Sequence, residues 1–226
     1  VHCDNKAECG IMVTASHNTK EYNGFKIIVR NQVVAGEMLQ KIKHLMLSDR
    51  PNHCQSGHIR TQDISSQYLQ AIIDNCSPKK DFKIVIDCAN SIVGPIAKTL
   101  FNRLGYNLIP LFCDPDGNFP NHDPNPSDES NLQQLKASVL SHQADLGLAF
   151  DGDGDRLVVI SGSGATVWPD QLLMIFARDI LKRYPNTDIV FDVKSSFRLQ
   201  QLVRELSGNP VMCKTGHSHV RSRVQK

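Results

Sequence analysis

The sequence lacks a long apolar run, a marked excess of one charge, and any C-x-x-C pair of cysteines. Without about 20 consecutive apolar residues, no membrane-spanning helix is expected. The 25 lysine and arginine residues nearly balance the 23 aspartate and glutamate residues, which argues against nucleic-acid and membrane-surface partners because these select for basic proteins. The seven cysteines, an odd number, favour reduced thiols. Residues 1–10 show no apolar core of a signal peptide, so we expect a cytoplasmic protein that acts on a small molecule.

Short apolar runs alternate with helical patterns through much of the chain, which has 226 residues and is 40% hydrophobic. Runs typical of strands occupy residues 83–88, 108–112, 145–150, 157–161 and 188–193. Strands that alternate with helices favour parallel pairing through right-handed crossovers. We therefore predict an α/β fold with mixed, mainly parallel sheets and flanking helices.

Two polar segments divide the chain into three units. Residues 48–62 are rich in His, Ser, Asn and Pro, and residues 161–164 read Ser-Gly-Ser-Gly. Both compositions are typical of linkers. We therefore predict units at residues 1–62, 63–163 and 164–226, of which the outer two are shorter than a typical domain of on the order of 100 residues.

The strongest chemical signal is the loop of residues 151–156, Asp-Gly-Asp-Gly-Asp-Arg, which lies between two apolar runs. Three carboxylates at alternate positions repel one another, and the glycines allow the tight turn that brings them together. A divalent cation would relieve this repulsion, and oxygen ligands favour Mg²⁺ or Ca²⁺. The spacing excludes a calcium EF-hand, because Arg156 and Gly162 stand where its glycine and glutamate are required. We predict an Mg²⁺ site beside a phosphate contact from Arg156; a solvated acidic turn is the alternative.

A second polar cluster follows an apolar run near the start of the chain, where residues 14–18 read Thr-Ala-Ser-His-Asn. Ser16 at a strand end, with His17 beside it, is a candidate nucleophile or phosphoacceptor. The Tyr-Asn-Gly turn at residues 22–24 returns the chain into a second strand and brings Lys26 close to Ser16. Adjacency in sequence does not by itself make a catalytic pair, so an ordinary capped turn is the alternative.

These motifs resemble those of the α-D-phosphohexomutases, in particular their bacterial phosphomannomutase/phosphoglucomutase branch. The phosphoserine loop of that family, T-x-S-H-N-P followed by Y-N-G-x-K, is similar to residues 14–26, and its magnesium loop is the same D-G-D-G-D-R as residues 151–156. The resemblance extends through residues 117–122, 192–194 and 214–218. Residues 117–122, Gly-Asn-Phe-Pro-Asn-His, favour this branch over the phosphoglucosamine branch. We therefore expect phosphohexomutase-type domains.

The resemblance implies an Mg²⁺-dependent enzyme that interconverts the 1-phosphate and 6-phosphate of a hexose, mannose or glucose. Ser16 would be a phosphoserine that gives its phosphoryl group to the sugar and regains one from a bisphosphorylated intermediate. The expected ligands of Mg²⁺ are Asp151, Asp153, Asp155 and Ser16. Glucose 1,6-bisphosphate or mannose 1,6-bisphosphate is the expected activator.

The resemblance also implies roles for residues around the serine. His17 and Lys26 are candidates for moving the proton of the sugar hydroxyl, and Lys26 can act as a base only if its pKa is lowered, which Mg²⁺ and Arg156 would favour. The residues expected to bind the sugar phosphate or orient the loop are Asn18, Arg156, Lys194 and His217. We expect the full-length protein to be a monomer that binds hexose phosphate, without a nucleic-acid or membrane partner.

The sequence departs from the family pattern in several places. Thr19 replaces a proline and removes a fixed φ from the serine loop, and Phe197 stands near Lys194 where relatives often carry a charge. The family's G-E-M-S-G-H loop and C-terminal phosphate-binding domain are absent from the sequence, so we expect it to be part of a four-domain enzyme and inactive by itself. The alternative functions are a non-catalytic metal- and phosphate-binding relative and a phosphoglucosamine mutase.

Overall fold

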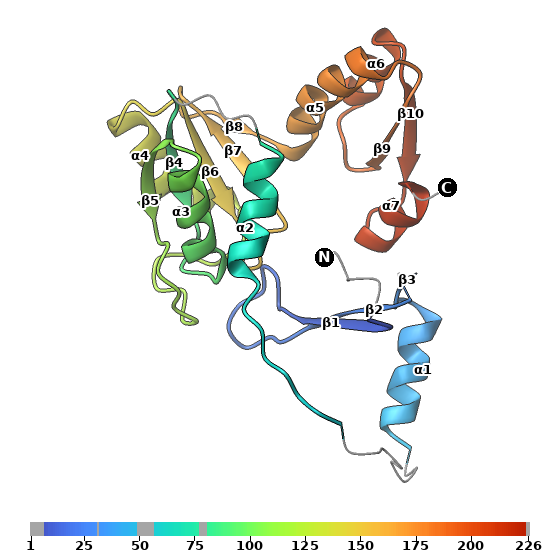
Figure 1. The fold of residues 1–226 in the computed structure, drawn as a ribbon. Coiled ribbons are helices and arrows are strands. Elements are labelled where there is room, and N and C mark those ends of the chain that lie inside the picture. Colours follow the sequence, from blue (N-terminus) through green and yellow to red (C-terminus); the bar gives the residue numbers. More distant parts are fainter. Residues whose placement is uncertain (1–6, 31, 49–56, 77–80, 225–226) are drawn as a thin grey trace.

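The computed structural model describes residues 7–30, 32–48, 57–76 and 81–224, without the side chains of residues 217 and 218. Three sheets form in separate parts of the chain, as Figure 1 shows. Their strand orders are β1-β2-β3, β5-β4-β6-β7-β8 and β10-β9. The predicted α/β fold with mixed sheets and flanking helices is confirmed.

An antiparallel hairpin with a short third strand forms the first sheet. Its elements are β1 (Cys9–Val13), β2 (Phe25–Val29), β3 (Gln32–Val33) and the following helix α1 (Glu37–Met46). In the register of the hairpin, Met12 pairs with Lys26 and Val13 with Phe25. The loop between β1 and β2 therefore begins and ends at the same end of the hairpin. Ser16, in this loop, and Lys26, near the start of β2, both lie at that end.

The five-stranded sheet is the largest layer of the molecule. Its strands are β4 (Lys83–Asp87), β5 (Asn107–Leu111), β6 (Leu146–Phe150), β7 (Leu157–Ser161) and β8 (Thr166–Val167). Strands β5, β4 and β6 are parallel, whereas β6–β7 and β7–β8 are antiparallel. The six residues between β6 and β7 are too few for a crossover, which needs about a dozen residues, so parallel pairing stops at β6.

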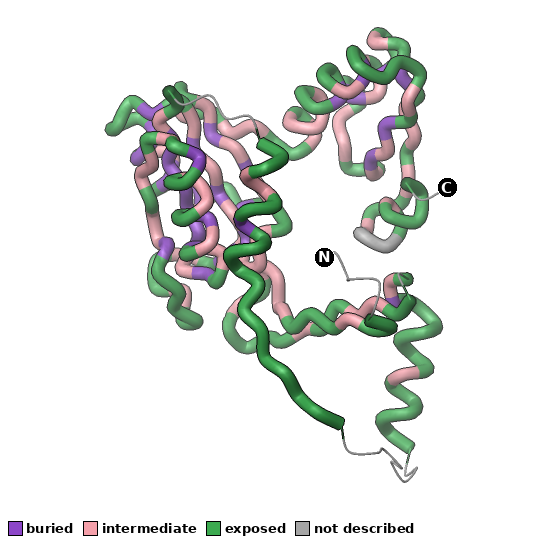
Figure 2. The backbone as a smooth tube through the Cα atoms, in the orientation of Figure 1, coloured by how far each residue is buried: buried purple, intermediate pink, exposed green. Residues whose placement is uncertain are grey.

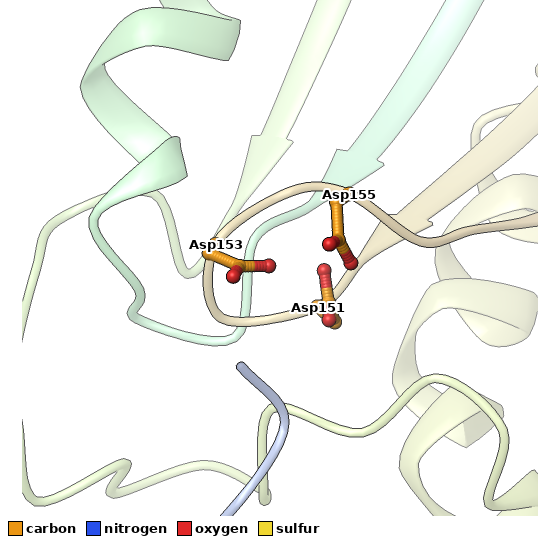
Figure 3. Close-up of side chains that lie close together, drawn as sticks. All are labelled: Asp151, Asp153 and Asp155. Carbon is orange, nitrogen blue, oxygen red and sulfur yellow. The ribbon is translucent and has the colours of Figure 1, made fainter. Parts of the chain in front are cut away.

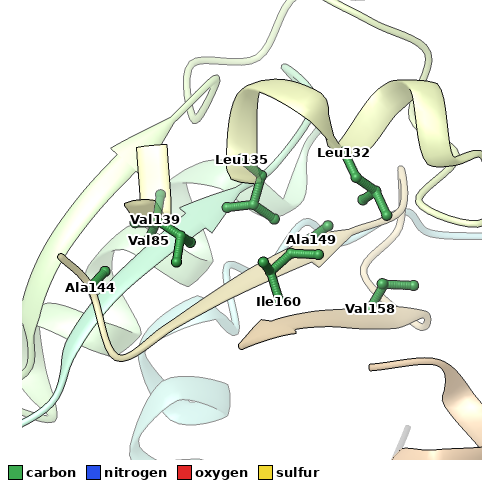
Figure 4. Packing of buried hydrophobic residues seen from close by; sticks show 8 residues of the cluster. All are labelled: Val85, Leu132, Leu135, Val139, Ala144, Ala149, Val158 and Ile160. Atoms are coloured by element: carbon green, nitrogen blue, oxygen red, sulfur yellow. The ribbon is translucent and has the colours of Figure 1, made fainter. Parts of the chain in front are cut away.

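Helices cover both faces of this sheet. They are α2 (Ser65–Asp74), α3 (Val93–Arg103), the short 3-10 helix η1 (Glu129–Leu132) and α4 (Gln133–Ser141). Central strand β4 is apolar and buried, and its residues alternate between two cores. Val85 packs with Leu135, Val139 and Ile160 under α4, as Figure 4 shows, and Ile86 packs with residues of α3 on the other face. Burial on both faces explains the continuous apolar run of β4.

The C-terminal part of the chain builds a smaller layer. It contains α5 (Pro169–Arg183), β9 (Asp188–Asp192), α6 (Phe197–Glu205), β10 (Asn209–Cys213) and α7 (His217–Val224). Strands β9 and β10 are parallel, and Leu181, Phe191 and Leu199 are among the buried residues that pack between them and the helices. Among the described residues, no helix combines the length and apolarity needed to cross a bilayer.

Burial differs among the three layers. Buried residues concentrate in the five-stranded sheet and in the α5–β10 layer, whereas the hairpin and α1 contain almost none (Figure 2). Side chains exposed on the hairpin include Ile11, Val13 and Phe25. The buried acidic residues Asp87 and Asp151 lie at the carboxyl ends of β4 and β6.

Candidate phosphoryl-transfer and metal site

The serine loop is a compact turn between β1 and β2. The Thr14 amide donates to the Gly24 carbonyl at 2.9 Å, which closes the base of the loop. The Ser16 amide donates to Thr14 Oγ1 at 2.9 Å, and the Ser16 backbone is left-handed with a φ of 54°. Because non-glycine residues adopt this region rarely, the conformation indicates that the loop holds Ser16 in place against local strain.

The acidic loop between β6 and β7 gathers three carboxylates. One carboxylate oxygen from each of Asp151, Asp153 and Asp155 lies within 4.8 Å of the other two, and Figure 3 shows the three side chains pointing toward one another. The Gly154 amide donates to the Asp151 carbonyl, and the Arg156 amide donates to Asp151 Oδ1, each at 3.1 Å. These bonds fold the loop back on the buried Asp151 side chain.

The two loops are joined by side-chain hydrogen bonds. Ser16 Oγ donates to Asp151 Oδ2 at 2.9 Å, and Thr14 Oγ1 donates to Asp153 Oδ2 at 2.8 Å. A Cβ atom on Gly152 would overlap the Ser16 carbonyl oxygen, so only glycine allows this approach of the two backbones. The serine hydroxyl is therefore held directly against the acidic cluster.

Lys26 neutralises part of the acidic cluster. Its Nζ lies 2.9 Å from Asp153 Oδ2 and 2.7 Å from Asp155 Oδ2. Burial alone would lower the pKa of Lys26, but the hydrogen bonds and charges of the two carboxylates outweigh it and raise that pKa. The lowered pKa expected for a base is thus opposed in this structure, because the carboxylates lie closer to Lys26 than any described cation.

The pKa values of Asp151 and Asp153 shift in opposite directions. Burial raises the pKa of Asp151, with a further contribution from the charges of Asp153 and Asp155, against hydrogen bonds from Arg156 and Ser16. Burial would also raise the pKa of Asp153, but hydrogen bonds from Lys26 and Thr14 lower it overall. Burial therefore disfavours the charged form of Asp151, whereas the hydrogen bonds from Lys26 and Thr14 favour the charged form of Asp153.

The residues fit a hard divalent cation. Asp153 Oδ1 is buried and has no hydrogen-bond partner among the described residues, and an unpaired buried oxygen is costly unless it has a ligand. Asp151 is buried beside two other carboxylates. An all-oxygen cluster that includes the Ser16 hydroxyl suits Mg²⁺ better than a softer metal.

The other predicted residues near Ser16 lie at the edge of the cluster. His17 Nδ1 is 3.4 Å from Ser16 Oγ, and Arg156 Nε is 3.8 Å from Asp151 Oδ2. The Asn18 side chain is exposed, and the backbone amide of Asn18 donates to the Ala15 carbonyl. Both His17 and Arg156 can thus reach a group bound at the serine, while Asn18 contributes to the turn.

Two predicted residues belong to the C-terminal layer. Lys194 follows β9, its amide donates to Asp192 Oδ1, and its side chain is exposed. Within the described residues, no hydrogen bond or ion pair joins Lys194 to the serine or acidic loop. His217 begins α7, but its side chain lies outside the described residues. The structure therefore brings together the predicted residues of the first two layers, whereas Lys194 has no hydrogen bond or ion pair to them among the described residues.

Thr14 is a site residue that the sequence reasoning missed. Its hydroxyl both accepts from the Ser16 amide and donates to Asp153, so it connects the two loops. The available signal was a hydroxyl residue at a strand end, two positions before the serine. Its long-range partner could not be inferred, because Thr14 and Asp153 are separated by 139 positions.

Comparison with known proteins gives a consistent family. Sequence models described as Phosphoglucomutase/phosphomannomutase, alpha/beta/alpha domains I, II and III, match residues 2–52, 66–164 and 168–226. A crystal structure of a phosphoglucomutase/phosphomannomutase family protein from Burkholderia thailandensis superimposes with a TM-score of 0.88 at 39% identity, covering 96% of this chain and 47% of that one. The expected phosphohexomutase-type domains are confirmed.

Curated relatives agree with these matches. The Phosphomannomutase/phosphoglucomutase of Pseudomonas aeruginosa is 44% identical over 223 residues, which are 98% of this chain and 48% of the relative. The Phosphoglucomutase of a Neisseria meningitidis serogroup A strain is 41% identical over 223 residues, 97% of this chain and 48% of the relative. The chain thus spans about half the length of the curated relatives it matches. With the D-G-D-G-D-R loop closed on Ser16 and three domain models matched in order, the chain belongs to the phosphoglucomutase/phosphomannomutase family.

Proposed function

We propose that this chain carries the phosphoserine and metal-binding parts of a mutase that interconverts the 1-phosphate and 6-phosphate of mannose or glucose. The observation that carries the proposal is the 2.9 Å hydrogen bond from Ser16 Oγ to Asp151 within a cluster of three carboxylates. A phosphoryl group on Ser16 would bring negative charge to this cluster, which only a cation could balance. The geometry therefore supports a serine that is phosphorylated beside a divalent metal.

In this proposal, Ser16 Oγ alternately carries and releases the phosphoryl group. The bond between Ser16 Oγ and phosphorus breaks as the oxygen of a sugar hydroxyl bonds to phosphorus. The hydroxyl proton passes to a base, and the released Ser16 Oγ takes up a proton. Mg²⁺ held by Asp151, Asp153, Asp155 and Ser16 would supply the positive charge that stabilises the transferring phosphoryl oxygens. Thr14 and Gly152 support the step by holding the serine and acidic loops together.

Two side chains are candidates for the proton. Lys26 is held by Asp153 and Asp155, whose charges raise its pKa. Neutralisation of those carboxylates by Mg²⁺ would remove this cause and allow Lys26 to release a proton. His17, with Nδ1 at 3.4 Å from Ser16 Oγ, is the second candidate. The two are distinguished by which substitution removes the acidic limb of the pH–rate profile, where activity falls because the base becomes protonated.

The substrate is proposed to be bound by residues from different units. Arg156 and Asn18 would contact or orient the phosphate near Ser16, and Lys194 and His217 would bind the sugar phosphate from the C-terminal unit. We propose that residues 1–62 supply the phosphoserine, 63–163 the metal loop and 164–226 part of the sugar site. Glucose 1,6-bisphosphate or mannose 1,6-bisphosphate would act as intermediate and activator of a cytoplasmic, monomeric enzyme.

The experiment is phosphorylation of the protein by ³²P-labelled glucose 1,6-bisphosphate in the presence of Mg²⁺. We expect about one phosphoryl group per chain, located at Ser16 by mass spectrometry and lost in Ser16→Ala. Ser66→Ala is the matched control, because Ser66 is exposed on α2. Equal incorporation in Ser16→Ala would overturn the assignment of Ser16. In the full-length protein, incorporation without isomerisation of glucose 1-phosphate would favour the non-catalytic alternative, and isomerisation of glucosamine 1-phosphate alone would favour a phosphoglucosamine mutase.

A further inference from the structure

The Gly-Asn-Phe-Pro-Asn-His motif of residues 117–122 ends in a histidine that the proposed reaction does not use. The His122 side chain is only 14% exposed, and its Nε2 lies 3.1 Å from both carboxylate oxygens of Asp87. Asp87 ends β4 and is 1% exposed. Its Oδ1 also accepts from the Ala89 amide at 3.0 Å. The histidine thus meets a buried carboxylate at the carboxyl edge of the central strand.

Both ring nitrogens of His122 face acceptors. Nδ1 lies 2.9 Å from the Asp123 carbonyl oxygen, which can only accept a hydrogen bond, and Nε2 faces the Asp87 carboxylate. A ring that donates from both nitrogens is an imidazolium. Burial would lower the pKa of His122, but Asp87 outweighs it and raises that pKa. His122 and Asp87 therefore form an ion pair. The Phe112 ring packs edge-on against the His122 ring, with 5.5 Å between the ring centroids.

This ion pair fixes the turn that follows it. The Asp123 carbonyl that accepts from His122 also accepts from the Asn125 amide at 2.8 Å. Between these two bonds lies Pro124, whose side chain is fully buried. Pro124 is thus held in a turn in which the Asp123 carbonyl accepts hydrogen bonds from the His122 ring and from the Asn125 amide.

Pro124 lies against the acidic loop. A Cβ atom built on Gly152 would lie 3.7 Å from Pro124 Cβ and would overlap the Ser16 carbonyl oxygen. The serine loop, the acidic loop and the Pro124 turn therefore meet at one glycine. Gly152 lies between Asp151 and Asp153, so a shift of this glycine would move two of the three clustered carboxylates.

We propose that the His122–Asp87 ion pair is a positioning element for the acidic loop. It holds the turn of residues 123–125, which supports Gly152 through Pro124 and keeps Asp151 and Asp153 in the arrangement that binds a divalent cation against Ser16. His122 touches neither the metal ligands nor the serine, so it acts through the turn. The part of this inference that concerns cation binding rests on the proposed function, whereas the support of the loop does not.

The test compares His122→Gln with His142→Gln in the whole 226-residue chain. His142 is an exposed histidine that precedes β6, at the end of that strand opposite the acidic loop. The first readout is hydrogen exchange of the Gly154 and Arg156 amides in metal-free protein, because both donate to Asp151. The second is Mg²⁺ affinity by isothermal titration calorimetry. Near-ultraviolet circular dichroism identifies the folded variants.

We expect faster exchange of the two amides and about tenfold weaker Mg²⁺ binding in His122→Gln, as is usual when a residue that orients metal ligands is lost. His142→Gln should match the wild type in both. If His122→Gln does not fold, Pro124→Gly takes its place, because it retains the ion pair and removes the Cβ atom that faces Gly152. Unchanged exchange and affinity in a folded variant would overturn the inference.

The outcomes separate this inference from the proposed function. If the wild type binds no Mg²⁺ but His122→Gln still loosens the acidic loop, the support role stands and the metal site is wrong. If the wild type binds Mg²⁺ and the variant binds it equally with the loop unchanged, the metal site stands and the support role is wrong.

Discussion

Ser16 and Asp151 are joined by a hydrogen bond of 2.9 Å although 135 positions separate them in the sequence. The serine comes from the hairpin and the aspartate from the carboxyl end of β6, so the bond connects two layers of the molecule. Each loop has its own internal hydrogen bonds, and the backbones touch at Gly152. The site is therefore created by the packing of two preformed loops.

Gly152→Ala should separate these loops. The added methyl group would overlap the Ser16 carbonyl, a backbone atom that cannot move independently. We expect a loss of about 1–3 kcal/mol in the free energy of unfolding, as is usual for overpacking, and a large loss of Ser16 phosphorylation. Urea unfolding and labelling with the bisphosphate measure the two effects. Gly117→Ala is the control, because a Cβ there meets no atom within 4 Å; equal behaviour of the two variants would contradict the close approach.

Asp153→Asn should weaken Mg²⁺ binding. The substitution removes a carboxylate charge and changes the buried Oδ1 atom that has no partner among the described residues. Because loss of an outer-shell group already costs about 10- to 100-fold in metal affinity, we expect at least the upper end of that range. Calorimetric titration with Mg²⁺ measures it, with the exposed Asp179→Asn as control. An affinity equal to that of the wild type would show that Asp153 is not a ligand.

Lys26→Met should have the opposite effect on metal affinity. The ammonium group pairs with Asp153 and Asp155 and therefore competes with any cation for these oxygens. Without it, the carboxylates repel one another more strongly, and we expect Mg²⁺ to bind severalfold more tightly while phosphoryl transfer to a sugar hydroxyl falls. Parallel calorimetry and single-turnover transfer from phosphorylated protein test both parts. Weaker Mg²⁺ binding in this variant would mean that Lys26 supports the metal site.

The His122–Asp87 ion pair predicts a pH dependence of stability. The pKa of His122 is raised above its usual 6.5 in the folded chain, so the stabilisation is complete below pH 6.5 and is lost as pH rises through the folded-state pKa. We expect His122→Gln to lower the free energy of unfolding by about 2 kcal/mol at pH 5.5 and by much less at pH 9. Urea unfolding at both pH values measures this difference. A penalty that grows with pH would contradict a charged His122.

The sequence predicted individual elements better than their meeting points. The alternation of apolar runs and helical patterns indicated β4, β6, β7 and β9, because burial determines those patterns locally. The acidic loop could also be predicted from the sequence, since its three carboxylates lie within six residues. The extent of parallel pairing was overestimated, because the same short loop makes β6 and β7 antiparallel.

The family resemblance implied that Ser16 meets the acidic loop, but the other contacts between distant segments were beyond sequence reasoning. The hydrogen bond from Thr14 to Asp153 and the close packing of Gly152 against Ser16 and Pro124 depend on how two layers pack. The pKa of Lys26 was expected to fall because Mg²⁺ and Arg156 were placed beside it. In the structure two carboxylates are its nearest charged groups and raise it. Charge balance at such a site depends on which partner is closest, and residue types alone do not give that distance.

The most direct test of the central claim is ³¹P NMR of the phosphorylated chain titrated with Mn²⁺ as a paramagnetic substitute for Mg²⁺. If phosphorylated Ser16 lies against the cluster of Asp151, Asp153 and Asp155, substoichiometric Mn²⁺ should broaden the phosphoserine resonance beyond detection, and Asp153→Asn should restore it. A phosphoserine signal that stays sharp with one equivalent of bound Mn²⁺ would contradict a shared phosphoryl and metal site.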